Sequence, residues 1–209
     1  MLLLLLGYLI GSLPTGYLVG RIKGVDIRKV GSGNIGATNV LRVLGVKLGV
    51  LVLLIDICKG ILACFLGAYL LQQISTQTAL VPVKITTDPA LVLLLGGIGA
   101  ILGHSFTCWL KFRGGKGVAT TAGVFLAVVP IPTAIVVGIF LLVTWISRYV
   151  SLGSICAAIA LPLCVYFFHA STALIVLTTL CAIVVIVRHK SNIRRLIAGT
   201  ENKIGAKNK

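Results

Sequence analysis

The sequence contains few acidic residues. It has four Asp and Glu against 19 Lys and Arg among 209 residues, which gives a formal net charge of +15. Metal-assisted chemistry on a pyrophosphate needs several clustered carboxylates. The acids are too scattered to supply such a cluster readily, so the sequence argues against a metal-dependent phosphotransferase, and we expect no metal site and no cofactor. The four acids are Asp26, Asp56, Asp88 and Glu201.

Several catalytic motifs are also missing. The six cysteines include no Cys-x-x-Cys pair, so neither a disulfide framework nor a metal site is indicated. No Gly-x-Ser-x-Gly elbow is present, which argues against a covalent serine enzyme. The His-x4-Asp dyad of many acyltransferases is absent, because Trp109 stands five residues after His104. Gly115-Lys116 is not a Walker A loop, because Leu110 stands where that motif has its first glycine.

Apolar residues dominate what is present, at 58% of the chain with a mean hydropathy of +1.10. A soluble core cannot use so much apolar surface, so we predict an all-α polytopic membrane protein with a single domain over residues 1–209. Several apolar runs are shorter than the roughly 20 residues of a straight crossing, so we expect about seven transmembrane helices, with five or six crossings also possible. The runs fall at about 2–20, 48–71, 90–104, 117–129, 132–147, 152–168 and 171–187.

The basic residues follow one alternate set of connections between these runs. The set holds all but two of the 19 Lys and Arg residues, the exceptions being Lys59 and Lys84. Because cytoplasmic loops carry an excess of Lys and Arg, we predict an outside N-terminus and a cytoplasmic C-terminus. Basic loops beside apolar spans fit anionic lipids and substrates better than nucleic acid. The connections are residues 21–47, 105–116, 148–151 and 188–209.

The first polar motif is GSGNIGATNVLR, residues 31–42. Its glycines free the backbone, its Ser, Thr and Asn residues offer neutral hydrogen bonds, and Arg42 supplies a cation, so such a loop can wrap an oxyanion. The simpler alternative is a polar turn before an N-capped helix.

The second motif is GHSFTCWLKFRGGKGVAT, residues 103–120. Glycines let backbone N–H groups approach an anion, and Lys116 and Arg113 add positive charge. Ordinary anchoring charge explains Lys111 but not the Gly114–Gly117 segment. His104 could act as a base, a hydrogen-bond donor or a packing residue.

The third motif is RHKSNIRRLIAGTEN, residues 188–202. If the last helix continues, Arg188, His189, Asn192 and Arg195 share roughly one face. The alternative is the usual basic stop after a terminal span, although that function does not need His189 and Asn192.

Other polar residues inside or near the apolar runs have simpler interpretations. Asp56 and Lys59 are three residues apart within one span, where charges are costly, and we favour mutual pairing over a direct function. Ser151 and Ser154 could join a polar site, although serine is common at helix ends. We expect packing at the membrane interface for His169.

Taken together, these motifs resemble the bacterial acyl-phosphate:glycerol-3-phosphate acyltransferase family, the membrane enzymes called PlsY. The resemblance extends over essentially the whole chain, with no departure in the polar part of the motifs. It rests on GSLPTGYLVG, GSGNIGATNVLR, DICKG, GHSFTCWLKFRGGKGVAT, RYVSLGS and RHKSNIRRLIAGTENK, in this order.

The resemblance implies a seven-helix enzyme of the bacterial inner (cell) membrane, with its active site on the cytoplasmic side. Such an enzyme transfers a fatty acyl group from acyl phosphate to glycerol 3-phosphate, which gives 1-acyl-glycerol 3-phosphate (lysophosphatidate) and phosphate and opens phospholipid synthesis. The family works with a partner, PlsX, that makes the acyl phosphate. The resemblance implies no cofactor, and membrane lipids surround the enzyme.

The resemblance also implies a set of site residues. Catalytic roles are expected for Ser32, Asn34, Lys116 and His189. Acyl phosphate would be held by Ser32, Gly33, Asn34, Gly114, Gly115, Gly117 and Ser154. Glycerol 3-phosphate would be held by Arg42, Lys116, His189 and Asn192.

Two questions remain open at the level of sequence. The proton of the attacking hydroxyl could pass to a histidine or to a substrate phosphate, because no carboxylate base is in evidence. A small anion or phosphate transporter is the alternative function, since basic loops and short, proline-broken helices would suit it too. Against a transporter, the polar residues gather on one membrane face, and no paired repeat is present.

Overall fold

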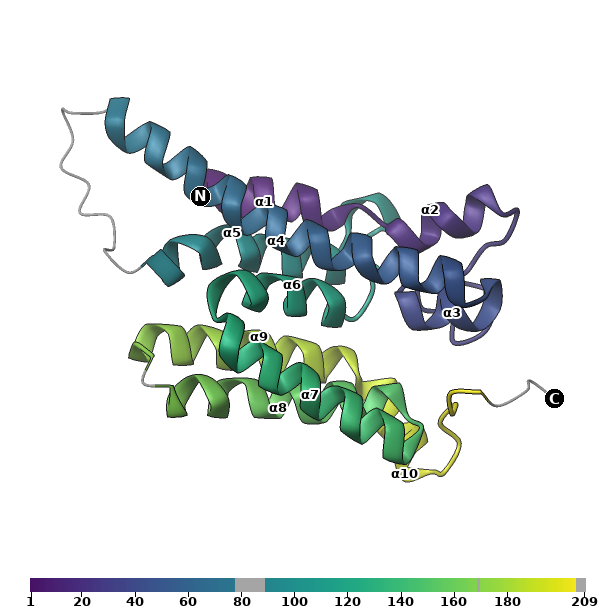
Figure 1. Cartoon of the computed structure of the whole chain (residues 1–209). Helices are drawn as coiled ribbons and strands as arrows, with labels where there is room; N and C mark the ends of the chain where they lie inside the picture. The colour runs from purple at the N-terminus through teal and green to yellow at the C-terminus, as the bar shows by residue number, and fades with distance from the viewer. Residues whose placement is uncertain (78–88, 169, 206–209) are drawn as a thin grey trace. The chain divides into compact units, whose positions relative to one another are not determined.

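The computed structural model describes residues 1–77, 89–168 and 170–205, which contain helices and no strands. The all-helical prediction is therefore confirmed for this part of the chain. The helices form two compact units, Met1–Val128 and Val129–Lys209, and each is described by itself (Figure 1). The single domain over residues 1–209 stays a prediction. Our expectations for Lys84, Asp88 and His169 concern positions outside the described residues.

The first unit is built on the long helix α4, against which α1, α2, α3, α5 and α6 all pack (Figure 1). Helices α2 and α3 also contact each other. The loop of the first motif, residues 31–36, therefore lies between two short helices that rest on α4, and the rest of the motif forms part of α3. The elements are α1 (Leu2–Ser12), α2 (Thr15–Ile22), α3 (Ala37–Leu44), α4 (Val46–Gln77), α5 (Pro89–Ser105), η1 (Cys108–Leu110) and α6 (Val118–Val128).

The second unit packs α8 against both α7 and α9, and the short helix α10 contacts α8 and α9. Pro130 occupies the first position of α7, where its missing N–H costs no helix hydrogen bond. The predicted break at 129–132 is confirmed, because α6 ends at Val128 and α7 begins at Pro130. The elements are α7 (Pro130–Ser147), α8 (Val150–Phe167), α9 (Thr172–Arg188) and α10 (Lys190–Ile197).

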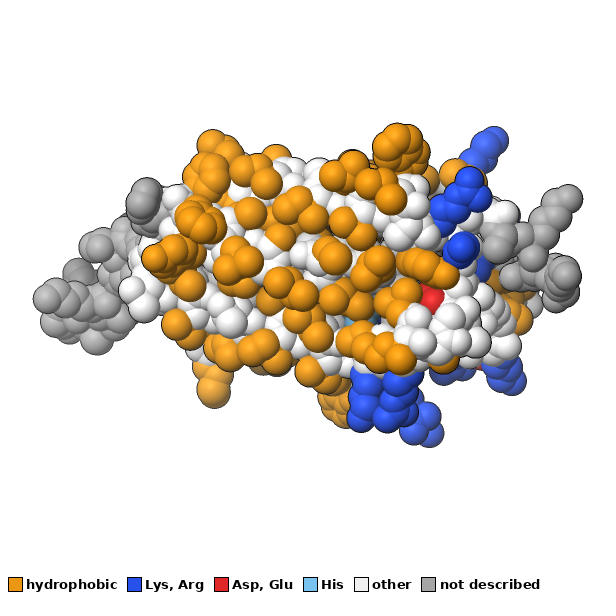
Figure 2. Space-filling view, turned by 90° about the horizontal axis from the view of Figure 1, so that it is seen from below, with side chains coloured by type: hydrophobic (Ala, Val, Ile, Leu, Met, Phe, Trp, Pro, Cys, Tyr) orange, Lys and Arg blue, Asp and Glu red, His pale blue; other side chains and the backbone are white. Residues whose placement is uncertain are grey.

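Every predicted apolar run coincides with a helix or, in the first case, with a broken helix. Among the described residues, five spans are long and apolar enough to cross a membrane, or six if the bent pair α9 and α10 counts as one. Helix α6 has only 11 residues and is too short for a straight crossing. Seven crossings and the orientation of the termini therefore stay predictions. On the face drawn in Figure 2, hydrophobic side chains cover most of the surface, and the visible Lys and Arg side chains gather toward one end.

The first span is interrupted at Leu13-Pro14, between α1 and α2. Proline has no N–H and disfavours helical geometry in the residue before it, and Leu13 accordingly has an extended ψ of 113°. The Leu13 carbonyl accepts a hydrogen bond from Thr15 N at 3.0 Å instead of continuing the helix. The break therefore turns a backbone oxygen toward the interior of the first unit.

Glycine permits α1, α4 and α5 to approach closely. A Cβ added at Gly7 would lie 2.0 Å from the Gly96 carbonyl oxygen, and one added at Gly96 would lie 2.1 Å from that of Ala63. Small residues at such contacts let backbones pack without a hydrophobic driving force between helices. Gly96 is therefore the position at which the three helices meet.

We expect Gly96→Ala to destabilise the protein by about 1–3 kcal/mol, because the added methyl group overpacks backbone that cannot move aside. Thermal unfolding in detergent, followed by circular dichroism, would measure the loss. Gly138→Ala is the matched control, since nothing lies within 4 Å of a Cβ at that helical position. Equal melting temperatures for the two variants would contradict the packing assignment.

Candidate functional site

Asn39 organises the loop of the first motif. Its side chain is 1% exposed, and its Oδ1 accepts a hydrogen bond from Ser32 N at 2.8 Å. Its Nδ2 lies 2.9–3.1 Å from three backbone carbonyl oxygens, which share its two N–H donors. The side-chain amide of Asn39 thus provides hydrogen-bond partners for backbone groups of the turn before α3. Its contact with the backbone N–H of Ser32 fixes the position of that residue. The three carbonyls belong to Ile27, Val30 and Asn34.

Glycine is required at two positions of this loop. Gly31 and Gly33 have φ of +59° and +70°, which L side chains rarely adopt. Asn34 follows them, and its Oδ1 accepts a hydrogen bond from Gly36 N at 2.8 Å. This contact turns the amide nitrogen of Asn34 away from the loop, in an orientation suited to donation.

An apolar cluster joins the first two motifs within the first unit. Ile35 and Val40 from the first motif, Val52 from α4 and Leu110 from η1 are buried together. The cluster requires no polar contact, so it can hold the two loops in place while their polar groups serve another purpose. The residues that the sequence identified as two separate anion-binding loops are therefore anchored to one core.

The glycine segment of the second motif folds back on the end of α5. Gly114 N donates to Ser105 O at 3.2 Å, and Gly115 N donates to His104 O at 3.0 Å. A Cβ at Gly114 would lie 2.0 Å from His104 O, and one at Gly115 would lie 2.1 Å from His104 Nε2. Both glycines are therefore required for contact with His104 rather than for freedom of φ.

The same segment leads directly into the N-terminus of α6. Gly117 has a φ of +82° and precedes Val118, the first residue of that helix. The first N–H groups of a helix have no partner within it and favour negative charge. Lys116 stands beside these donors in the chain, and within the described ranges the buried hydroxyl of Ser105 has no hydrogen-bond partner. The local chemistry suits an oxyanion.

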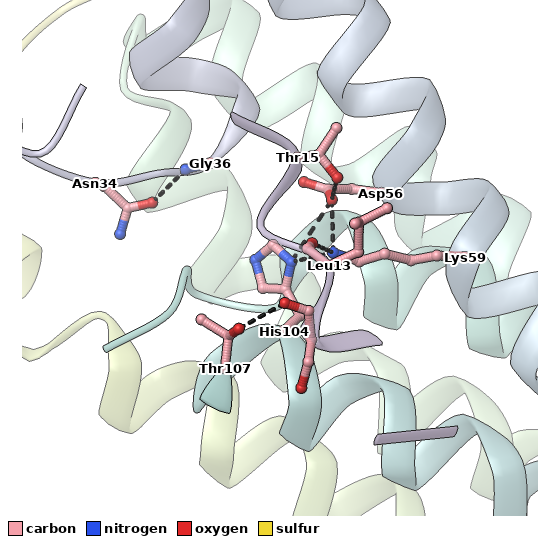
Figure 3. A network of polar contacts seen from close by, with 9 residues as sticks. Leu13, Thr15, Asn34, Gly36, Asp56, Lys59, His104 and Thr107 are labelled. Carbon is pink, nitrogen blue, oxygen red and sulfur yellow. Dashed lines mark hydrogen bonds and ion pairs between the residues drawn. The ribbon is translucent and has the colours of Figure 1, made fainter. Parts of the chain in front are cut away.

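Asp56 and Lys59 pair with each other, as predicted, with Lys59 Nζ 2.7 Å from Asp56 Oδ1. The pair is part of a larger network that the sequence did not reveal. Thr15 Oγ1 donates to Asp56 Oδ1 at 3.1 Å, and Lys59 Nζ donates to Leu13 O at 3.1 Å. His104 Nδ1 lies 2.9 Å from the same ammonium (Figure 3). The network therefore links the break in the first span to α4 and α5.

One cation of the loop between α2 and α3 is neutralised by a neighbour. Arg28 donates to both carboxylate oxygens of Asp26, at 2.9 and 2.8 Å, and its guanidinium lies over the Tyr17 ring. The side-chain hydrogen bond from Arg28 holds the pKa of Asp26 well below its ordinary value, so the carboxylate stays ionised at neutral pH. Arg28 lies outside the first motif, whose own cation is Arg42.

In the second unit, the third motif begins at a bend. Helices α9 and α10 meet at 58°, and His189 lies between them, so the last helix does not continue straight as the shared-face argument assumed. His189 is 2% exposed, and its Nδ1 lies 2.8 Å from Val185 O. A carbonyl can only accept, so Nδ1 carries the proton and the lone pair of a neutral ring is on Nε2.

Glu201 orients Asn192 and was not assigned a role from the sequence. Its carboxylate accepts from Asn192 Nδ2 at 2.8 Å and from Arg195 Nε at 2.7 Å. Because a carboxylate only accepts, the amide oxygen of Asn192 must face the other way. This buried Oδ1 has no hydrogen-bond partner among the residues that the structure describes. Asn192 and His189 thus offer acceptors, which suits a ligand with hydroxyl groups.

Two serines of α8 are buried near its start. Ser154 Oγ donates to Val150 O at 2.8 Å, so its hydroxyl proton is used within the helix. Ser151 Oγ has no hydrogen-bond partner in the part of the chain that the structure describes. The expected contact of Ser154 with acyl phosphate stays a prediction.

The predicted site residues divide between the two units. Within residues 1–77 and 89–128, the structure brings the first and second motifs onto one core. Within the described part of the chain, no group of three or more His, Cys, Asp and Glu could hold a metal ion. Ser32, Gly33, Asn34, Arg42, Gly114, Gly115, Lys116 and Gly117 belong to the first unit, and Ser154, His189 and Asn192 belong to the second.

Comparison with known proteins finds relatives over nearly the full chain. Residues 1–199 match the family described as glycerol-3-phosphate acyltransferase. A protein of that name from Fusobacterium nucleatum subsp. nucleatum is 46% identical over 201 residues, covering 96% of this chain and 95% of the relative. Another from Trichlorobacter lovleyi is 46% identical over 199 residues, covering 95% and 94%.

Two crystal structures of PlsY (YgiH), an integral membrane glycerol 3-phosphate acyltransferase, are similar in fold. The glycerol 3-phosphate form has a TM-score of 0.85 and 36% identity, and the lysophosphatidic acid form has 0.83 and 35%. Each comparison covers 98% of this chain and 94% of the solved one. The similarity confirms a multi-span integral membrane fold.

We expect Asn39→Ala to loosen the loop at residues 31–36, because four backbone groups lose a buried partner and each costs about 1–3 kcal/mol if left unsatisfied. Hydrogen–deuterium exchange at Ser32 N would rise, since Asn39 Oδ1 is its acceptor. Thr38→Ala, one residue earlier on α3, is the matched control. Unchanged exchange in the Asn39 variant would show that the amide does not hold the loop.

Proposed function

This chain belongs to the family of glycerol-3-phosphate acyltransferases, and we propose that it transfers a fatty acyl group from acyl phosphate to glycerol 3-phosphate. The products are 1-acyl-glycerol 3-phosphate (lysophosphatidate) and inorganic phosphate. The chain is an enzyme and an integral membrane protein with several spans, and this reaction is the first acylation of phospholipid synthesis.

The observation that carries the proposal is that the motifs differ in the hydrogen-bonding groups they offer. The first and second motifs present cations, glycine backbone and a helix N-terminus, which suit phosphate. The third motif presents Nε2 of His189 and Oδ1 of Asn192, which accept hydrogen bonds and suit the hydroxyls of glycerol. A phosphate-bearing acyl donor and a polyol acceptor together match both kinds of group.

We assign the site residues as follows, from the family pattern and the local chemistry of each motif. Ser32, Asn34, Lys116 and His189 take part in catalysis. Acyl phosphate binds Ser32, Gly33, Asn34, Gly114, Gly115, Gly117 and Ser154. Glycerol 3-phosphate binds Arg42, Lys116, His189 and Asn192.

The reaction needs no covalent intermediate on the protein. The acceptor hydroxyl oxygen forms a bond to the acyl carbon, the bond from that carbon to the phosphate oxygen breaks, and phosphate leaves with the electron pair. Backbone N–H groups and Lys116 stabilise the developing negative charge, as in an oxyanion hole. Holding both substrates lowers the entropic part of the barrier.

The hydroxyl proton has two acceptors of suitable chemistry. Nε2 of His189 carries the lone pair in the neutral ring, because Nδ1 donates to Val185 O. A phosphate oxygen of a substrate is the other acceptor. Replacement of His189 distinguishes between these two proton acceptors.

The enzyme acts in the bacterial cell (inner) membrane, with its site on the cytoplasmic side. The basic connections support this orientation, because Lys and Arg accumulate on cytoplasmic loops. The acyl chain lies between helices or at the lipid boundary, where apolar burial contributes most of its affinity. The acyl phosphate comes from a partner enzyme, PlsX in this family.

Purified protein given palmitoyl phosphate should release phosphate only when glycerol 3-phosphate is also present, with matching formation of lysophosphatidate. Lys116→Ala should lower the rate by about 10²-fold or more, the size of effect seen when one stabilising donor is lost. Lys111→Ala is the matched control, because Lys111 is exposed in the same connection and should keep the wild-type rate.

Phosphate flux into proteoliposomes without ester formation would instead support the alternative, a small anion transporter. A folded preparation that neither forms lysophosphatidate nor moves phosphate would contradict both functions.

His189→Gln tests the proton acceptor. If His189 is the base, turnover should be abolished while glycerol 3-phosphate binding, measured by isothermal titration, stays nearly intact. Loss of binding would show that His189 holds the substrate and would leave the proton to a substrate phosphate. Retention of both turnover and binding would contradict the assignment of His189 to the site.

A further inference from the structure

The buried network around Lys59 has more members than charge neutralisation requires. Asp56 and Lys59 are 2% and 5% exposed and pair within one turn of α4. A buried ion pair repays the cost of burial only where the remaining N–H donors also find acceptors. The Leu13 carbonyl and the His104 ring supply these acceptors for the Lys59 ammonium. The contact with His104 has a further consequence, because it constrains which nitrogen of the ring carries the proton.

The donors of Lys59 fix the protonation of His104. A lysine ammonium has three N–H donors and no acceptor. Its three neighbours are Asp56 Oδ1 at 2.7 Å, Leu13 O at 3.1 Å and His104 Nδ1 at 2.9 Å. Because the ammonium can only donate, Nδ1 must accept. The neutral His104 ring therefore carries its proton on Nε2.

The protonated nitrogen faces the glycine segment of the second motif. A Cβ at Gly115 would lie 2.1 Å from Nε2, so the imidazole edge lies directly against this backbone. The backbone oxygen of His104 accepts from Gly115 N at 3.0 Å. One residue therefore contacts Gly115 through both its side chain and its backbone.

We propose that Asp56 and Lys59 lock His104 as the Nε2–H tautomer, and that His104 positions residues 114–117 for phosphate binding. His104 is then a positioning residue and not a base, because the nitrogen that faces the loop already carries a proton. The part of the proposal that concerns phosphate rests on the proposed function. The tautomer of His104 and its contact with the loop are independent of that function.

The two buried histidines would then have opposite tautomers. His189 donates from Nδ1 to Val185 O, whereas His104 accepts at Nδ1 from Lys59. The opposition gives an internal reference for the experiment, since both rings can be measured in one sample of the full chain.

The direct test is ¹⁵N NMR of full-length protein in nanodiscs, labelled at the histidine ring nitrogens. Chemical shift distinguishes protonated from unprotonated ring nitrogens, and His104→Gln and His189→Gln assign the signals. We expect a proton on Nε2 of His104 and on Nδ1 of His189. A His104 signal with the proton on Nδ1, or on both nitrogens at neutral pH, would overturn the proposal.

The functional test compares two replacements of His104 that differ in where they place a donor. His104→Gln can put an amide N–H near the position of Nε2 and should retain most of the activity. His104→Asn reaches only the position of Nδ1 and should lose about 10²-fold in kcat, the cost of misplacing a catalytic element by about 1 Å. Equal activity of the two variants would contradict the positioning role.

The double variant Asp56→Leu/Lys59→Met separates positioning from stability. Replacing a buried ion pair by apolar residues is often neutral for folding, so the melting temperature should be near that of the wild type. His104 should then show both tautomers, and kcat should fall. A wild-type kcat in this variant, or an unchanged single tautomer, would refute the lock.

Failure of this proposal is distinguishable from failure of the proposed function. An Nε2–H tautomer of His104 in a protein without acyltransferase activity would contradict the proposed function and support the tautomer assignment. Full acyltransferase activity with a different His104 tautomer would support the proposed function and contradict the tautomer assignment.

Discussion

The constraint on which this structure depends is that a polar group away from water must find a partner inside the protein. Lys59 satisfies it with a carboxylate, a backbone carbonyl and an imidazole, and Asn39 satisfies it with four backbone groups. Each solution joins segments that are distant in the sequence. The cost of burial therefore limits where the loops can lie, because these buried donors need acceptors that come from distant segments.

Glycine makes this arrangement possible in two different ways. At Gly31 and Gly33 it supplies a backbone conformation that other residues rarely adopt. At Gly96, Gly114 and Gly115 it supplies space, because backbone or a histidine ring occupies the place of a side chain. The first use shapes a loop that holds Ser32 and Asn34. The second lets helices pack closely and lets residues 114 and 115 donate hydrogen bonds to the end of α5.

Much of the architecture could be predicted from the sequence, because hydropathy along the chain is a direct consequence of the membrane. The apolar runs coincide with the helices, and the break before Pro130 follows from the chemistry of proline. The bend at His189 could not be predicted in this way, since Arg188 to Asn192 is compatible with a continuous helix. In the bent arrangement α10 contacts α8 and α9, and such tertiary contacts are not visible in a local pattern of residues.

The residues of the candidate site could be predicted from the sequence, but the orientations of their side chains could not. Glycine and basic residues next to apolar spans indicated an anion, and a resemblance to a known family identified the reaction. Sequence separation gave no sign that Glu201 turns the amide of Asn192, or that Asp56 and Lys59 continue to His104. Such contacts depend on the directions of individual lone pairs and N–H bonds, which no pattern of residue types encodes.

The interruption at Leu13-Pro14 has a consequence for any attempt to reduce this protein to a smaller catalyst. The Leu13 carbonyl is a ligand of the Lys59 ammonium, and it is available only because the first span does not continue as one helix. A membrane segment that carries none of the basic loop motifs is thereby an integral component of the buried polar network. A minimal version assembled from the motif-bearing loops and their nearest helices would lack this oxygen, so the hydrophobic N-terminal segment cannot be exchanged for a generic membrane anchor.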